Sequence, residues 1–367
     1  MSKRIFHIVL LCFTLLVWAG YGCGALVTYL PSPAPWWLDV AGLAFPYMFF
    51  LMLICIVIWL TRRWQLALIS VCILLCGWKG IIHTWGWHWR NEAVSAEEGF
   101  TLMSFNVNDF KSMASSWQHW REDFDHILYF HNADIICLQE FATTDLYSQD
   151  EKNNVLHYTT LLQKPYAYFT NDFQWHTPYG YTWYFGNIIL SKFPFVDTGK
   201  LFLDHRHHIS MAYADVRIGT DTVRIITTHL QSFGLEEAEV QGLKDPNPEV
   251  SRRLLYKLRK GYQLREHQAV MAARLVRESP HPVIVCGDLN TTPVSATYFT
   301  VRGHLQDAFL KKGAGLGRTY TRYAPTLRID YIFVDPRLEV KGFEVLHIRA
   351  SDHYPVMAGI DQRSDGS

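Results

Sequence analysis

The sequence has no surplus of either charge, because 34 lysines and arginines balance 34 aspartates and glutamates over 367 residues. Proteins that bind nucleic acid through a broad basic surface usually carry a basic surplus, so the composition gives no sign of such a surface. Cysteine is sparse after residue 90, where only Cys137 and Cys286 occur, each inside an apolar run. There is therefore no basis for a disulfide framework or for a zinc site with cysteine ligands. Internal repeats and low-complexity segments are also lacking.

Long apolar runs fill the first 90 residues, at positions 5–30, 36–60 and 64–85. Each run is long enough to cross a hydrocarbon layer, which takes about 20 apolar residues. A cleaved signal peptide is the competing interpretation of the first run, but the run is longer than a typical signal core. Helices buried in a soluble domain would show a polar face, and none is visible. The sequence therefore predicts three transmembrane helices in residues 1–90 and a globular domain in residues 91–367.

The basic residues at the ends of these runs predict the orientation of the chain in the membrane. Lys3 and Arg4 precede the first run, Arg62 and Arg63 follow the second, and the first connection carries no basic residue. The N-terminus and the second connection are then expected in the cytoplasm, so that the third crossing delivers the globular domain to the other side. Lys79, inside the third run, is expected to extend toward the outer surface. We expect an integral membrane protein with an extracytoplasmic domain.

Short apolar runs alternate with amphipathic segments from residue 100 onward. The runs expected to be strands are 100–106, 134–138, 187–190, 211–216, 223–228, 282–286, 330–334 and 354–358. Apolar residues at helical spacing indicate helices at 117–132 and at about 250–277. Several strands with few helices favour two packed sheets flanked by helices, which is a four-layer α/β/β/α sandwich of the α+β class.

Acid, amide and imidazole side chains stand at or just beyond the ends of these strands. They are Asn106, Glu140, His229, Asp288, Asn290, Asp330, Asp352 and His353. Gly287 allows a sharp turn after which Asp288 and Asn290 point the same way in an extended chain, although an isolated pair of this kind also suits an Asx turn. Lone acids such as Glu140 and Asp330 are usual in solvated turns. Together, however, the set is what metal-assisted attack on a phosphate ester requires.

The same residues stand in motifs that resemble those of the endonuclease/exonuclease/phosphatase superfamily, the fold of DNase I, exonuclease III and neutral sphingomyelinase. The resemblance covers about residues 99–361, and the motifs agree in order and approximate spacing. They are Ser104-Phe-Asn106, Leu138-Gln-Glu140, Gly186-Asn187-Ile-Ile-Leu-Ser191, Thr228-His229-Leu230, Gly287-Asp-Leu-Asn290, Arg328-Ile-Asp330-Tyr and Ser351-Asp-His-Tyr-Pro355. The resemblance implies a DNase I-like sandwich after the apolar N-terminal segment, as in membrane-anchored bacterial members, and hence a place in the bacterial inner membrane.

The resemblance also implies a divalent metal site. Glu140 would be the principal ligand of Mg²⁺, or of Mn²⁺, with Asp352 and Asn106 near the same ion, and oxygen ligands of this kind suit a hard cation. Many nuclease members carry an acid two residues after the first asparagine, where this sequence has Asn108 followed by Asp109. This departure leaves open whether one or two metals bind.

The catalytic groups follow from the same resemblance. His353, oriented by Asp330, would act as general base toward the attacking water. Asp288 and Asn290 would position that water and the phosphate, and His229 would donate to a phosphoryl oxygen or to the leaving group.

Other residues remain open to more than one interpretation. Asn187 and Asn108 are expected to bind substrate. The aromatic segment 175–184 would stack on bases, contact lipid head groups or pack under its own loop, and 313–320 would be a rim loop of the site or a plain connector. The clustered histidines 205, 207 and 208 would bind metal or phosphate, or form a solvated turn.

We expect a Mg²⁺-dependent phosphoesterase, more a diesterase than a monoesterase, in which activated water attacks without a covalent intermediate. A nuclease is the commonest theme in the family, whereas membrane tethering favours a phospholipid or sphingomyelin-type head-group phosphodiesterase. A phosphomonoesterase acting on a small phosphoester is a third alternative. A catalytically silent membrane-tethered binding module is the non-enzyme alternative, but inactive relatives should lose site residues and this chain keeps them. No obligate protein partner is indicated.

Overall fold

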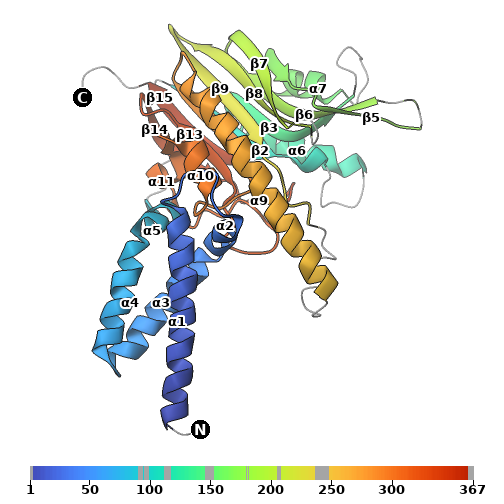
Figure 1. The fold of residues 1–367 in the computed structure, drawn as a ribbon. Coiled ribbons are helices and arrows are strands. Elements are labelled where there is room, and N and C mark those ends of the chain that lie inside the picture. The colour runs from blue at the N-terminus through green and yellow to red at the C-terminus, as the bar shows by residue number, and fades with distance from the viewer. Residues whose placement is uncertain are drawn as a thin grey trace. The chain divides into compact units, whose positions relative to one another are not determined.

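The computed structural model describes residues 3–89, 94, 99–110, 117–144, 153–178, 180, 182–204, 208–235 and 248–362, without the side chains of residues 3 and 117–120 (Figure 1). The chain divides into two compact units. Unit 1 comprises Met1–Trp85, Ser232–Val270 and Thr291–Val301, and unit 2 comprises Gly86–Gln231, Met271–Asn290 and Arg302–Ser367. Two later segments therefore join the N-terminal residues in unit 1, while the expected division of the chain into domains at residue 90 stays a prediction.

The N-terminal part of unit 1 consists of helices α1 (Lys3–Val27), α2 (Trp36–Leu43), α3 (Phe45–Leu60), α4 (Trp64–Cys76) and α5 (Trp78–Thr84). Among the described residues, one helix, Arg4–Val27, is long and apolar enough to cross a membrane by itself. The bent pairs α2–α3 and α4–α5, with bends of 63° and 61°, would raise the number to three if each pair were one span. Pro46 favours a new helix start at α3, because a proline in the first turn needs no hydrogen-bond donor there.

Polar contacts tie these helices to the later segments of unit 1, which come from α9 (Pro248–Arg277) and α10 (Ala296–Arg302). Asp39 Oδ1 in α2 accepts from the Ala296 amide at 2.8 Å. Glu266 Oε1 in α9 accepts from the Ala34 amide at 2.9 Å. Both carboxyl groups are buried, so each amide is paired inside the unit rather than hydrated.

Close packing in unit 1 requires a glycine in α2. A Cβ atom on Gly42 would lie 2.0 Å from the Val294 carbonyl oxygen, and Val294 belongs to the apolar cluster of the helices. Lys79, expected to extend toward the membrane surface, donates to the Thr28 carbonyl and lies 4.2 Å from the centre of the Phe299 ring. The segment at 291–301 is therefore part of the helical core of unit 1.

Unit 2 contains two main sheets. The seven-stranded sheet has the order β14-β15-β2-β3-β6-β4, with β5 paired to β6, and the six-stranded sheet has the order β11-β13-β10-β9-β8-β7. The bounds of the first set are β2 (Phe100–Asn106), β3 (Ile135–Thr143), β4 (Tyr166–Phe169), β5 (Phe173–His176), β6 (Thr182–Ser191), β14 (Leu338–Val345) and β15 (Val356–Gln362). Those of the second are β7 (Phe195–Asp204), β8 (Ile209–Ile218), β9 (Asp221–His229), β10 (Val283–Asp288), β11 (Gln306–Asp307) and β13 (Asp330–Val334).

Short elements complete unit 2: β1 (Gly86–Trp87), the 3₁₀ turn Asn108–Phe110, α6 (Trp117–Phe130), α7 (Asn154–Leu161), α11 (Ala308–Lys312) and β12 (Ala314–Gly315). The main core contains residues of both sheets, including the free cysteines Cys137 and Cys286. A second cluster joins Phe124 and Leu128 of α6 to Ile136 of β3. Alternate β3 residues face the two clusters, as a strand buried on both faces requires. The expected α+β fold with packed sheets is confirmed, and the outer helical layer on the six-stranded sheet stays a prediction.

Candidate active site at the strand ends

Strand register brings three of the expected site residues to the same edge of the six-stranded sheet. Strands β9 and β10 run parallel and align His229 with Asp288, and β13 runs antiparallel to β10 and aligns Asp330 with Asp288. Parallel strands end at the same edge of a sheet, and an antiparallel neighbour begins at that edge. His229, Asp288 and Asp330 therefore lie side by side although the first and the last are 101 positions apart in the sequence.

The seven-stranded sheet supplies the remaining residues at its own edge. Strand β2 ends at Asn106, which aligns with Gln139 of the parallel strand β3 and thus lies beside Glu140. Strand β15 is antiparallel to β2, so the segment just before it returns to the end of β2. In that segment Ser351 Oγ donates to the Asn106 carbonyl at 2.8 Å and contacts Asp352 Oδ1 at 3.4 Å.

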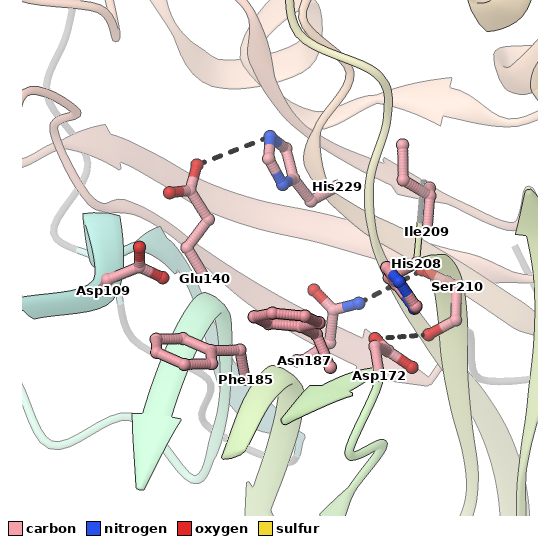
Figure 2. A pocket seen from close by; sticks show the side chains of 11 residues that line it. Asp109, Glu140, Asp172, Phe185, Asn187, His208, Ile209, Ser210 and His229 are labelled. Carbon is pink, nitrogen blue, oxygen red and sulfur yellow. Dashed lines mark hydrogen bonds and ion pairs between the residues drawn. The ribbon is translucent and has the colours of Figure 1, made fainter. Parts of the chain in front are cut away.

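Asn106 links the two sheets through its buried side chain. Its Nδ2 donates to Glu140 Oε1 at 2.9 Å and to Asp288 Oδ2 at 3.1 Å. His229 Nε2 lies 3.5 Å from Glu140 Oε1, as Figure 2 shows, and 3.6 Å from Asp288 Oδ2. Four residues from four strands thus face one another between the sheets.

His353 and Asp330 form a buried imidazole–carboxylate pair. His353 Nδ1 lies 2.9 Å from Asp330 Oδ2 and 3.1 Å from Oδ1. A carboxylate only accepts, so Nδ1 carries the proton and Nε2 is left facing Asp288 Oδ2 at 3.6 Å. The amide of Asp330 is held in turn by Thr319 Oγ1 at 3.1 Å.

The charges of these groups are strongly coupled. Burial by itself lowers the pKa of His353, but the Asp330 and Asp288 carboxylates outweigh it and raise that pKa to about 10. Burial raises the pKa of Asp288 to about 6, and His353 partly opposes the rise. Without a cation at the site, His353 is therefore an imidazolium at neutral pH, paired with two carboxylates.

Unusual backbone conformations support the site. Glu140 has φ 50° at a bulge in β3, where pairing with β6 shifts between Leu138 and Phe141. The expectation that the strand at 134–138 ends just before Glu140 is wrong, because β3 continues to Thr143 and Glu140 lies at a bulge inside the strand. Asn290 also has φ 50°, and its amide N–H donates to Asp288 Oδ1 at 2.8 Å. Left-handed backbone at non-glycine residues is a recurrent mark of functional sites.

Gly287 is required by the close approach of β9. It has φ 132°, and a Cβ atom there would lie 2.0 Å from the Thr228 carbonyl oxygen. The sequence predicted that Gly287 allows the turn into Asp288 and Asn290. The structure adds a second reason for a glycine, which is the lack of space for a side chain.

The loop at 313–320 reaches the site, although the sequence left open whether it was a plain connector. Tyr320 bridges to His353, with ring centroids 4.8 Å apart, and the Thr321 amide donates to the Asp352 carbonyl at 2.8 Å. Arg322 Nε lies 3.4 Å from Asp352 Oδ2. Sequence reasoning placed Tyr320 in a possible rim loop but gave Thr321 and Arg322 no role, and the only signal for these two is that they follow the glycine-rich stretch of this loop.

The expected substrate-binding asparagines have different positions. Asn187 lines a pocket beside Glu140 and His229, whereas Asn108 is not among the residues that line it. Asn108 instead donates its backbone N–H to Asn106 Oδ1 at 3.0 Å, and its neighbour Asp109 faces the pocket (Figure 2).

Two expected metal ligands, Glu140 and Asp352, have partly accessible carboxylates, with 28% and 14% of their side chains exposed. Asn106 touches Glu140 directly and is linked to Asp352 through Ser351. The tightest group of potential ligand atoms among the described residues is a different one, Asp288, Asp330 and His353, within 4.8 Å of one another. His353 Nδ1 is hydrogen-bonded to Asp330 there. Glu140, Asp352 and Asn106 offer oxygen atoms, which suit a hard cation, and their role as metal ligands stays a prediction.

The aromatic segment 175–184 forms part of the β5–β6 hairpin, in which Trp175 pairs with Trp183. Trp175 is 53% exposed, whereas Trp183 packs against the second core cluster, so the packing alternative holds for Trp183 and not for Trp175. Tyr179 and Tyr181 of this segment lie outside the described residues, as do the clustered histidines 205 and 207.

Comparison with known families identifies the class. Residues 103–353 match the Endonuclease/Exonuclease/phosphatase family, and residues 3–84 match a family described as a domain of unknown function. The chain therefore belongs to the endonuclease/exonuclease/phosphatase family and is a phosphoric ester hydrolase. Enzymes of this family typically use a divalent metal. No curated protein matches the sequence.

Solved structures show the same fold. An endonuclease/exonuclease/phosphatase from Beutenbergia cavernae DSM 12333 matches with a TM-score of 0.53 and 18% identity, over 72% of this chain and 72% of that chain. The human Nocturnin catalytic domain with bound sulfate matches with a TM-score of 0.52 and 15% identity, over 74% and 97%. The D. rerio TDP2 complex with a single-strand DNA product matches with a TM-score of 0.50 and 16% identity, over 72% and 100%.

Proposed function

We propose that this protein is a membrane-bound, Mg²⁺-dependent phosphodiesterase in which His353 activates the attacking water. The observation that carries the proposal is the buried His353–Asp330 pair, in which the second imidazole nitrogen, Nε2, faces Asp288. Asp330 fixes the imidazole tautomer and stabilises the imidazolium that forms when His353 takes a proton. Asp288 and Asn290 orient the water toward the phosphorus atom.

The reaction breaks an O–H bond of water and a P–O bond of the ester, and forms one new P–O bond. His353 Nε2 takes the proton of the water. His229, between Glu140 and Asp288, donates to a phosphoryl oxygen or to the departing oxygen, which lowers the barrier where negative charge develops.

Glu140, Asp352 and Asn106 would hold the cation, Mg²⁺ or Mn²⁺, through oxygen atoms. When bound, a divalent cation stabilises the charge on the phosphoryl oxygens and lowers the pKa of His353, which is about 10 without it. The chain departs from the nuclease pattern at Asn108, and this supports one metal rather than two.

Membrane attachment through three spans, with a cytoplasmic N-terminus and the catalytic unit outside the cytoplasm of a bacterial cell, belongs to the same proposal. The long apolar helix α1 and the bent pairs α2–α3 and α4–α5 support it, and so does the position of the basic residues.

The substrate alternatives are nucleic acid, a lipid head group and a small phosphomonoester. The similar fold of D. rerio TDP2, which was solved with a single-strand DNA product, supports nucleic acid as a candidate substrate. The apolar helices instead favour a substrate at the bilayer. A silent binding module is disfavoured because the site residues are retained and brought together.

The full chain in detergent, with Mg²⁺, should be assayed on supercoiled plasmid, on mixed phospholipid vesicles and on sugar phosphates, each beside the His353→Ala variant. Cleavage of plasmid alone would select a nuclease, and release of phosphorylated head groups from vesicles would select the lipid alternative. Orthophosphate release from sugar phosphates alone would contradict the diesterase assignment. Cleavage that the variant retains would exclude His353 as the base.

A further inference from the structure

A pocket of about 120 Å³ adjoins the candidate active site and contains groups that the proposed reaction does not use. Glu140 and His229 form its border with the site, and its other lining includes Asp172, Asn187 and Ser210 (Figure 2). Its volume has room for one small group of atoms.

Asn187 presents a buried, unpaired acceptor to this pocket. The residue is 4% exposed, and its Nδ2 donates to the Ser210 carbonyl at 3.1 Å. This bond fixes the amide orientation and turns Oδ1 away from Ser210, as Figure 2 shows. Asn187 Oδ1 has no hydrogen-bond partner in the described part of the chain.

Asp172, which also lines the pocket, carries a second buried acceptor, and this one is ion-paired with Lys200. Its side chain is 5% exposed, and Oδ2 accepts from the hydroxyl groups of Thr170 and Ser210, each at 2.7 Å. The other oxygen, Oδ1, is buried and forms no hydrogen bond within the described residues. Lys200 Nζ is 3.7 Å from Oδ1, but its hydrogen bonds go to the carbonyls of Thr170 and Asn171.

The electrostatics favour a ligand that donates hydrogen bonds. Burial raises the pKa of Asp172 even though Ser210, Thr170 and Lys200 act against the rise. A donor on Oδ1 would therefore relieve a desolvated carboxylate. The described lining residues include the carboxylates Asp109, Glu140 and Asp172 and no lysine or arginine, so a second phosphate group is disfavoured.

Part of the pocket wall is aromatic. The rings of Phe173 and Phe185 lie 5.9 Å apart, and those of Phe173 and His208 lie 5.2 Å apart. Aromatic faces suit the C–H surface of a small carbon skeleton, while the two oxygens suit its hydroxyl groups. Aromatic rings together with oxygen acceptors suit a small group that carries several hydroxyls.

We propose that this pocket binds a hydroxyl-bearing arm of the phosphate ester, a glycerol or sugar group, with Asp172 Oδ1 and Asn187 Oδ1 as its acceptors. The proposal rests on the proposed phosphodiesterase function of the adjoining site, and it makes Asp172 a residue that determines specificity.

The test uses the full-length protein and three p-nitrophenyl phosphodiesters as substrates. They differ only in the second ester group, which is glyceryl, propyl or choline. The propyl ester has the same chain length as the glyceryl ester but no hydroxyl group, and choline has no hydrogen-bond donor. The wild type should hydrolyse the glyceryl ester with a kcat/KM about tenfold or more above the propyl ester, the effect of one hydrogen bond to a charged acceptor.

Asp172→Asn should reduce this glyceryl-to-propyl ratio about tenfold, mainly through KM, because it replaces the charged acceptor by an amide. Asp221→Asn removes the same charge at an exposed position at the start of β9, and this variant should keep the wild-type ratio. A wild-type ratio near one, a ratio unchanged in Asp172→Asn, or a preference for the choline ester would each overturn the proposal.

Binding separates this proposal from the proposed function. Glycerol 1-phosphate is titrated by calorimetry into His353→Ala protein carrying either Asp172→Asn or Asp221→Asn. Weaker binding in the Asp172→Asn background alone would support the pocket even if no ester were hydrolysed. Equal binding in the two backgrounds would contradict it even if hydrolysis were normal.

Discussion

At the scale of single residues, the site depends on how one histidine is charged. His353 is buried between Asp330 and Asp288, and these carboxylates hold its pKa near 10 when no cation is bound. A base must be neutral to take a proton. In the proposed mechanism, the positive charge of a bound metal ion would lower the pKa of His353 and so make the imidazole available as a base.

The titration of His353 provides a direct prediction. In metal-free protein its imidazole should stay protonated through neutral pH and titrate near pH 10, and Asp330→Asn should lower that pKa. The same interaction stabilises the folded chain fully below pH 6.5, the ordinary histidine value, and is lost as pH rises through about 10. NMR of the imidazole signals against pH would measure it, with exposed His304 as the internal reference. Titration of His353 near pH 6.5 without metal would contradict the account.

At the scale of elements, the sequence predicted the strands that carry the candidate site better than the remaining strands. Alternating apolar runs located β2, β9, β10 and β13, and the polar residues at their ends converge as expected. Strands β4, β5 and β7 were missed, because their burial patterns are exposed or irregular and lack clear alternation. Strand β14, whose burial alternates over its first half only, was also missed. The bulge at Glu140 has no local sequence signal, since pairing with β6 creates it.

The turn after β10 carries a prediction about stability. Gly287→Ala should destabilise the protein by about 2 kcal/mol or more, because the new Cβ would lie 2.0 Å from the Thr228 carbonyl oxygen and φ is 132°. Thermal unfolding of the full chain in detergent would measure the change. Gly22→Ala is the matched control, since a Cβ there meets nothing within 4 Å. Equal unfolding midpoints for the two variants would show that the turn tolerates a side chain.

At the scale of the whole molecule, the apolar N-terminal segment is more than a linear anchor preceding a domain. Unit 1 includes residues 291–301, which directly follow Asn290 of the candidate site in the chain. Hydropathy identified the apolar runs, but no pattern in the sequence indicated that Asp39 and Glu266 would pair with amides of distant segments. Such contacts depend on tertiary packing and cannot be read from local periodicity.

Glu266 makes the stability of unit 1 dependent on pH. Burial, with a further contribution from the nearby Asp39 carboxyl, raises the pKa of Glu266 to about 7. The folded state therefore favours protonated Glu266. This contribution to the free energy of unfolding is fully present below pH 4.5, the pKa of Glu266 in the unfolded chain, and is lost as pH rises through about 7. Glu266→Gln should therefore unfold at a higher temperature than wild type at pH 8 and at a similar temperature at pH 5.

The matched control for this comparison is Glu344→Gln, at an exposed position of β14. It should leave the unfolding midpoint nearly unchanged at both values of pH. A wild-type midpoint that is equal to or higher than that of Glu266→Gln at pH 8 would contradict the assignment of a buried, costly charge to Glu266.

The central claim is that His353 drives a metal-dependent hydrolysis of phosphate esters. Its most direct test is hydrolysis of bis-p-nitrophenyl phosphate by the full chain with Mg²⁺ and with EDTA, for wild type, His353→Ala and the exposed control His304→Ala. The account predicts activity in wild type and His304→Ala that EDTA abolishes, and a kcat lower by about a thousandfold or more in His353→Ala, within the range lost with a general base. Activity that survives EDTA, or normal turnover by His353→Ala, would contradict it.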